Sequence, residues 1–183
     1  TPYKNVVDKG SRLCDGDSSN RGGVFEYEAK RIERWKNAEE PWIAGFFCYG
    51  FADDAVPIKN VDPDKKQITT ALPTYYGFSA GEKFNSLYGF NMLEEIDIPG
   101  EYFIDKKNKR IYFFPYDGED FSDLSLSVIE EPLIAVENSS NIYFENITFE
   151  CTRGMGVYVE GGSDIHFSSC IFRNIGTAAI CFG

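Results

Sequence analysis

A 23-residue repeat constrains the fold of this chain more than any other feature of its sequence. From about residue 117 onward, apolar residues alternate with polar ones in three short segments of each unit. Such alternation is typical of strands that bury one face. The alternating pairs that recur one period apart are Ile142/Phe144 with Ile165/Phe167, Leu124/Leu126 with Ile147/Phe149 and Cys170/Phe172, and Ile134/Val136 with Val157/Val159 and Ile180/Phe182.

Three short strands in each repeat are what one coil of a parallel β-helix needs. Turn residues separate the strands at 138–141, 161–164 and 174–176. Stacked coils lie about 4.8 Å apart, so equivalent inward side chains should stack, with Phe121, Phe144 and Phe167 in one column. A β-sandwich is the alternative, but its strands have no reason to keep one period across three units. We therefore predict an all-β chain containing the N-terminal, incomplete coils of a right-handed parallel β-helix.

Residues 24–116 lack this period and predict a β-rich subdomain that carries a short helix. The pattern favours a helix over 28–37, hairpins over 56–71 and 101–115, and one helical turn over 91–96. The predicted organisation is an N-terminal segment at 1–23, the subdomain at 24–116 packed on the first coils, and coils at 117–183. Because the sequence stops inside a repeat unit, we expect further C-terminal coils, in the same protein or in a cleaved companion chain.

The charge of the chain limits the classes of partner that it could bind. The net charge is −11, which argues against nucleic acid and anionic membranes, since both select basic surfaces. Residues 117–183 hold eleven acidic residues and two arginines, a net charge of −9. A polyanionic substrate would be repelled there, whereas an uncharged glycan or bridging Ca²⁺ would not. No run approaches the roughly 18 apolar residues of a membrane-spanning helix.

Cysteine and asparagine patterns favour an extracellular protein. The five cysteines show no CxxC or other metal spacing, so no metal site is predicted. Cys170 falls at an inward position as a small hydrophobe, whereas Cys181 faces outward and is the best candidate for pairing beyond this chain. Asn138 and Asn146 begin N-glycosylation acceptor triplets. With the aromatic-rich composition, they predict a secreted glycoprotein.

Three segments resemble a known family. They are RIERWKNAEEPWIAGFFCYGFADD at 31–54, YGFNMLEEIDIPGEYFIDKKNKRIYFFP at 88–115 and NIYFENITFE at 141–150. They are similar to secreted right-handed parallel β-helix repeat proteins of the pectate-lyase-like superfamily, over about residues 30–183. Some members are similar to glycoside hydrolases of plant cell-wall polysaccharides. The resemblance implies carbohydrate processing or binding, with the active-site carboxylates generally on later coils.

Candidate substrate contacts lie on the outward face of the third strand of each unit. Tyr158 could stack on a sugar ring, and Arg153 and Glu160 could hydrogen-bond its hydroxyls. The alternative is that all three are ordinary surface residues. No catalytic residue is assigned.

Other residue sets also permit both a functional and a structural interpretation. His166, with Tyr143 and Asp164 as predictable neighbours, is best read as a solvated histidine. Glu137 and Glu160 stand one period apart, and stacked carboxylates could form an acid pair or bind Ca²⁺; two solvated turn residues are the alternative. The Asp53-Asp54 pair is expected to close a turn, and the aromatic run at 46–49 is expected to be core.

The leading function predicted is a secreted carbohydrate-active β-helix protein that acts on a polysaccharide, as a hydrolase rather than a lyase. A lyase on uronate polymers would need basic residues or Ca²⁺ against the substrate carboxylates, and the coils offer two arginines. The first alternative is a non-catalytic structural or adhesive extracellular rod. The second is a glycan-binding module with aromatic platforms and no acid pair.

Overall fold

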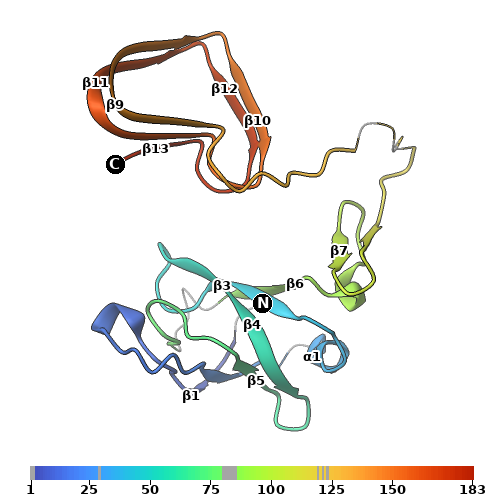
Figure 1. Cartoon of the computed structure of the whole chain (residues 1–183). Helices are drawn as coiled ribbons and strands as arrows, with labels where there is room; N and C mark the ends of the chain where they lie inside the picture. The colour runs from blue at the N-terminus through green and yellow to red at the C-terminus, as the bar shows by residue number, and fades with distance from the viewer. Residues whose placement is uncertain (1–2, 29, 80–85, 119, 121, 123) are drawn as a thin grey trace. The chain divides into compact units, whose positions relative to one another are not determined.

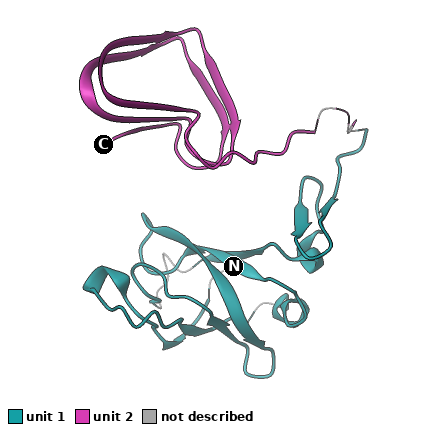
Figure 2. Cartoon of the chain, in the orientation of Figure 1, with its two compact units in different colours: residues 1–119 teal, residues 120–183 magenta. Residues whose placement is uncertain are grey.

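The chain is mostly β and forms two compact units. The computed structural model describes residues 3–28, 30–79, 86–118, 120, 122 and 124–183 (Figure 1). Unit 1 comprises residues 1–119 and unit 2 comprises residues 120–183 (Figure 2). Unit 1 contains an antiparallel sheet and unit 2 contains small parallel sheets. The β-rich class predicted from the sequence is confirmed.

A six-stranded sheet organises unit 1. Every neighbouring pair in it is antiparallel. Residues 6–8 take part in this sheet, so the N-terminal segment belongs to unit 1. The strands, in spatial order, are β1 (Val6–Asp8), β2 (Val24–Glu26), β5 (Gln67–Thr70), β4 (Asp53–Asp62), β3 (Trp42–Phe46) and β6 (Leu87–Phe90).

The local elements predicted for unit 1 are largely present. Strands β4 and β5 form the first hairpin, and β7 (Tyr102–Asp105) pairs with β8 (Arg110–Phe113) in the second. The predicted helical turn is the 3₁₀ helix η2 (Leu93–Glu95); a further 3₁₀ turn, η1, spans Leu13–Asp15.

The helix is shorter than the predicted span 28–37. Helix α1 covers Ile32–Trp35, and no side-chain hydrogen bond caps its first turn. Residue 29 lies outside the described residues. A helix this short is unstable alone, so burial of Ile32 and Trp35 in the unit 1 core holds it in place.

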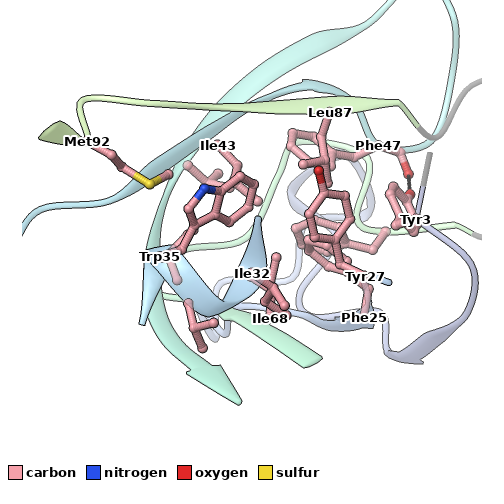
Figure 3. Close-up of a cluster of buried hydrophobic side chains, with 14 residues drawn as sticks. Tyr3, Phe25, Tyr27, Ile32, Trp35, Ile43, Phe47, Ile68, Leu87 and Met92 are labelled. Atoms are coloured by element: carbon pink, nitrogen blue, oxygen red, sulfur yellow. Dashed lines mark hydrogen bonds between the residues drawn. The ribbon is translucent and has the colours of Figure 1, made fainter. Parts of the chain in front are cut away.

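The core of unit 1 is rich in aromatic side chains (Figure 3). Tyr27 and Trp35 stack with ring centroids 5.2 Å apart. Gly89 on β6 permits this packing, because a Cβ there would lie 2.7 Å from the Trp35 ring. The buried members are Tyr3, Phe25, Tyr27, Ile32, Trp35, Ile43, Phe47, Val56, Ile58, Val61, Ile68, Phe78, Leu87 and Met92.

Unit 2 consists of parallel strands that repeat at a constant offset. Strands β9 (Ile134–Glu145), β11 (Val157–Ser168) and β13 (Ile180–Phe182) form one sheet, and β10 (Thr148–Thr152) pairs with β12 (Ile171–Ile175) in another. Partner residues in all three pairings lie 23 positions apart. The predicted period and the predicted parallel pairing are therefore confirmed.

Left-handed backbone conformations mark the corners of each repeat. Asn, Asp and Gly adopt positive φ most readily, which suits them to sharp changes of chain direction. Four positions have positive φ in both repeats, so the chain turns at the same places one period later. They are Asn138 and Gly161, Asn141 and Asp164, Asn146 and Ser169, and Cys151 and Asn174.

Stacked aromatic rings fill the interior of unit 2. Phe144 stacks on Phe167 with centroids 4.8 Å apart, and Phe149 stacks on Phe172 at 4.7 Å. These spacings match the distance between paired strands. Cys170 packs against the same cluster, which confirms its predicted inward position.

The prediction of an earlier coil containing Leu124 and Leu126 is wrong. These side chains are 68% and 64% exposed, and the described residues between 122 and 133 contain no strand. The stack begins at Ile129, whose carbonyl accepts the Arg153 N–H at 3.0 Å. Alternating apolar residues alone do not form a coil here, because residues 124–128 have no partner strand among the described residues. Phe121, the expected start of the aromatic column, lies outside the described residues.

Gly162 provides a test of the coil corners. It has a φ of +92°, and a Cβ there would lie 1.8 Å from the Ser139 carbonyl oxygen. We expect Gly162→Ala to destabilise unit 2 by about 2 kcal/mol or more, because the two stacked corners must move apart. Hydrogen exchange of the amides in 134–145 and 157–168 would accelerate accordingly.

Gly161→Ala is the matched control for this substitution. Gly161 has a φ of +69° at the same corner, and a Cβ there would lie 2.7 Å from the Asn138 side-chain oxygen, which can rotate away, rather than from backbone. It therefore reports the backbone strain in the same sheet without a backbone overlap. Equal acceleration of exchange in both variants would show that the stacked contact at Gly162 is unimportant.

Tyr3 joins the N-terminal residues to the core of unit 1. Its ring is 1% exposed, and its hydroxyl lies 2.5 Å from the Phe47 carbonyl (Figure 3). The same hydroxyl lies 2.7 Å from the Ser79 carbonyl. Burial raises the pKa of Tyr3 far above its ordinary value, because the phenolate would lose its hydration.

The raised pKa of Tyr3 predicts a loss of stability at high pH. Below about pH 10 the tyrosine is protonated in both states; above it only the unfolded state releases the proton. We expect the free energy of unfolding to fall by up to about 1.4 kcal/mol per pH unit above pH 10 from this residue. Tyr3→Phe should be less stable at pH 7 but should lack this fall.

Urea unfolding from pH 8 to 11 measures this effect. The fluorescence of Trp35 and Trp42 reports on unit 1, which contains both tryptophans. Parallel pH dependences in the wild type and in Tyr3→Phe would contradict the role assigned to this burial.

Candidate functional site

Two residues predicted to contact substrate meet on the outward side of strand β11. Tyr158 is half-buried and Glu160 is exposed. The negative charge of Glu160 raises the pKa of Tyr158, with further contributions from desolvation, from a hydrogen bond to Glu160, and from Cys181 and Glu137. The structure thus places a phenol beside a carboxylate on this strand.

A second carboxylate lies next to this pair. Glu137 on β9 is the register partner of Glu160 on β11, as the repeat predicts. Adjacent strands place the two backbones about 4.8 Å apart. Both side chains are exposed. Tyr158, Glu160 and Glu137 therefore form one cluster, which we call the coil-face cluster.

Arg153 pairs with a different carboxylate. Its guanidinium lies 2.7 Å from Glu130, and both side chains are about two-thirds exposed. An exposed ion pair of this kind contributes little to stability. The structure therefore unites Tyr158 and Glu160 but assigns Arg153 a partner of its own.

The remaining outward residues of the coils also stack by register. The Tyr143 and His166 rings are parallel to within 4°, with centroids 4.7 Å apart, as expected for register partners. The hydroxyls of Ser140 and Ser163 lie 3.1 Å apart. Among the described residues, no acid contacts His166 that would make it a general base.

Unit 1 contains a recess lined by aromatic rings, which we call the aromatic groove. Its volume is about 550 Å³, and it lies between strands β3 and β6, the 3₁₀ helix η2 and strand β7. Most of its lining is apolar, as is usual for ligand sites. Its lining residues are Trp42, Tyr88, Gly89, Phe90, Asn91, Met92, Glu95, Ile96, Gly100, Glu101, Tyr102, Ile104 and Lys106.

Strand alternation aims aromatic rings into the groove. Tyr88 and Phe90 share one face of β6, and Phe90 lies opposite Trp42, with ring centroids 6.0 Å apart. Tyr102 comes from the hairpin, whereas its neighbour Phe103 points to the other face and is buried. Tyr88 and Tyr102 are 64% and 61% exposed, so their rings are available to a ligand.

Charged groups around the groove are held by protein partners. The Glu95 carboxylate is 7% exposed and lies 2.6 Å from Arg31 and 3.3 Å from Arg34. Glu101 accepts backbone N–H bonds from Asp97 and Ile98 at 2.8 and 3.0 Å. These contacts fix two carboxylates beside the aromatic rings, and the remaining lone pairs of Glu101 can accept hydrogen bonds from hydroxyls.

The aromatic groove was not predicted from the sequence. Alternate aromatic positions at Tyr88 and Phe90 were a usable signal, but they do not reveal that Trp42 and Tyr102 meet them. Trp42 stands 46 positions before Tyr88 in the chain, and the antiparallel pairing of β3 with β6 unites them. Contacts of that sequence separation leave no local pattern.

The predicted glycosylation acceptors and the cysteines are all described residues. Asn138 and Asn146 are exposed at left-handed corners. All five cysteines, each a described residue, are free thiols. No cluster of three or more His, Cys, Asp or Glu side chains suited to a metal occurs in the described part of the chain. Among the described residues, no helix is long and apolar enough to span a membrane.

Comparisons with known proteins identify no relative. The chain matches no protein-family model, and searches of curated proteins and of solved structures find no significant match. The coil-face cluster and the aromatic groove are therefore the features that bear on function.

Proposed function

We propose that this chain belongs to an extracellular, carbohydrate-active protein built on a right-handed parallel β-helix. The constant 23-residue offset, the stacked phenylalanines and the repeated left-handed corners support that fold. The resemblance of three segments to secreted β-helix proteins supports the carbohydrate class and the extracellular location. In this proposal unit 1 binds the glycan and the coils carry a pair of carboxylates.

The observation that carries the proposal is the aromatic groove. The apolar faces of sugar rings pack on tyrosine and tryptophan, while hydroxyls need hydrogen-bond acceptors and donors nearby. Trp42, Tyr88, Phe90 and Tyr102 supply the rings, and Glu101 supplies a fixed acceptor. The groove volume lies within the usual range of small-ligand sites.

Charge favours a neutral glycan as the ligand of the groove. Among the described residues that line it, Lys106 is the one basic residue, and its ammonium lies 3.1 Å from Glu40. A uronate polymer would meet Glu95 and Glu101 without a free cation in the lining. Neutral polysaccharides avoid that repulsion.

Substitution of the exposed tyrosines tests the groove. We expect Tyr88→Ala and Tyr102→Ala each to weaken binding of a neutral oligosaccharide about tenfold, since each removes a stacking face. Isothermal titration calorimetry with a panel of neutral and acidic oligosaccharides measures the effect.

Tyr112→Ala is the control for these variants. Tyr112 is an exposed tyrosine on β8 that pairs with Phe103, on the opposite face of the hairpin from Tyr102. It does not line the groove. Equal losses of affinity in Tyr112→Ala and in the two groove variants would indicate a general effect on the fold of unit 1 and would contradict binding in the groove.

The coil-face cluster is the best candidate for hydrolytic chemistry. Retaining glycosidases hold two carboxyl groups about 5 to 5.5 Å apart, one as nucleophile and one as acid–base. Glu137 and Glu160 are register partners on adjacent strands whose backbones lie about 4.8 Å apart, so their exposed carboxyl groups can reach that separation. Tyr158, bonded to Glu160, would orient that carboxylate.

Amide substitutions test this assignment. We expect Glu137→Gln and Glu160→Gln each to reduce the release of reducing ends from neutral polysaccharide by at least about a hundredfold. Glu145→Gln, at an exposed position at the end of β9, should leave the rate unchanged. Unchanged hydrolysis in both test variants would exclude the cluster from catalysis.

A non-catalytic structural role is the second candidate. The exposed acceptor residues Asn138 and Asn146 at the corners would give a glycosylated rod. Folded wild-type protein that binds no glycan and hydrolyses none would favour this alternative.

A further inference from the structure

Three rings of the aromatic groove stand on two neighbouring strands of a twisted sheet. Trp42 on β3 lies directly opposite Phe90 on β6, and Tyr88 shares the face of Phe90 two residues earlier on that strand. Each strand of a sheet twists about its own axis, and adjacent strands are rotated relative to one another. Aromatic side chains carried by such strands are therefore not expected to share one plane.

The planes of these three rings differ accordingly. Trp42 and Phe90 are inclined by 44°, with centroids 6.0 Å apart. Tyr88 and Phe90 are inclined by 48°, with centroids 6.3 Å apart. Two rings at such an angle cannot both lie flat against one flat surface. A planar ligand can therefore stack fully on Phe90 or on its neighbours, but not on both.

Packing limits how far the central pair of rings can adjust. Trp42 is half-buried and Phe90 is 37% exposed, and each contacts the other. The backbone between Tyr88 and Phe90 is pressed onto the core, because a Cβ at Gly89 would lie 2.7 Å from both Met92 and Trp35. A flat ligand would have to turn the rings out of their present contacts, whereas a curved ligand would not.

The linkage between sugars decides whether a glucan chain is flat or curved. In cellulose the rings along a chain are nearly coplanar, so single chains form ribbons and crystals have flat faces. In laminarin and amylose the chain curves, so the plane of each sugar ring is turned relative to that of the next. Because the apolar face of a sugar packs on an aromatic ring, a curved chain can place successive sugars on successive inclined rings.

We propose that the aromatic groove binds a single, curved chain of neutral sugars and rejects flat glycan ribbons and crystalline polysaccharide surfaces. Successive sugars would stack on Trp42, Phe90 and Tyr88, and hydroxyls of the same chain would bond to the fixed carboxylate of Glu101. This deepens the proposed function by naming the shape class of the glycan. It rests on that function for the expectation that neutral glycans are the ligands of the groove.

Calorimetry with three glucose hexamers tests the shape preference in the full chain. Laminarihexaose and maltohexaose are the curved probes and cellohexaose is the flat one; all three contain glucose alone and differ in linkage. We expect at least one curved hexamer to bind at least about tenfold more tightly than cellohexaose, since the flat chain loses one or more stacking contacts. The protein should not sediment with crystalline cellulose.

The fluorescence of Trp42 locates the binding. Trp42 lines the groove, whereas Trp35, the other tryptophan, is 1% exposed and does not line it. The preferred hexamer should change the tryptophan emission of the wild type. Trp42→Phe should abolish this change while retaining most of the affinity, because phenylalanine keeps a stacking face.

Phe90→Ala tests the role of the inclined rings. Both inclined pairs include Phe90, so its removal should lower the affinity for the preferred curved hexamer about tenfold. The affinity for cellohexaose should change less, and the preference between the two probes should shrink accordingly. Thermal unfolding of the variant shows whether unit 1 remains folded.

Phe51→Ala is the matched control. Phe51 is 76% exposed in a second aromatic cluster of unit 1, where it stacks on Tyr49 with ring planes 8° apart. Neither residue lines the groove. The sequence predicted core for residues 46–49; Phe47 is buried, but Tyr49 is 40% exposed in this cluster. Phe51→Ala should leave both the affinity and the preference unchanged.

Several outcomes would overturn the proposal. They are equal or tighter binding of cellohexaose, sedimentation with crystalline cellulose that Tyr88→Ala abolishes, an unchanged preference in Phe90→Ala, or its loss in Phe51→Ala. Equal binding of the three hexamers that is lost in Tyr88→Ala would refute the shape class and leave the proposed groove in place. Binding of none of the hexamers, with no change in Trp42 emission, would refute both.

Discussion

Parallel backbone pairing at a fixed offset is the interaction on which unit 2 depends. Backbone pairing between equivalent residues of successive repeats requires every turn of the chain to contain the same number of residues. Strands, corners and interior side chains therefore all recur at 23 residues. The phenylalanine stacks follow from this register, because rings at equivalent positions are separated by the spacing of the strands. The same constraint brings Glu137 beside Glu160 and Tyr143 beside His166 on the outward side.

Unit 1 is organised by long-range antiparallel pairing around an aromatic core. The ion pairs of Glu95 with Arg31 and Arg34 join η2 to the region of α1 and so fix one wall of the aromatic groove. A nearly buried carboxylate with two guanidinium partners avoids the large penalty of an isolated charge. The groove therefore has a firm polar boundary beside rings that remain exposed.

The recesses in the described part of unit 1 differ in size and lining. The aromatic groove is large, its carboxylates already have partners, and its rings suit neutral sugar faces. A smaller recess of about 210 Å³ includes the buried Thr74, whose hydroxyl has no hydrogen-bond partner among the described residues.

The sequence by itself determined the period, the parallel register, both hairpins of unit 1 and the union of Tyr158 with Glu160. These follow from alternation and spacing, which are local or strictly periodic. It failed at Leu124 and Leu126, because alternation predicts a buried face but cannot provide the partner strand that buries it. Only the tertiary structure decided that Trp42 meets Phe90, that Tyr102 is exposed beside them, and that the Thr74 hydroxyl is buried without a partner among the described residues. Those contacts join segments far apart in the chain, and their geometry depends on the packing of the whole unit.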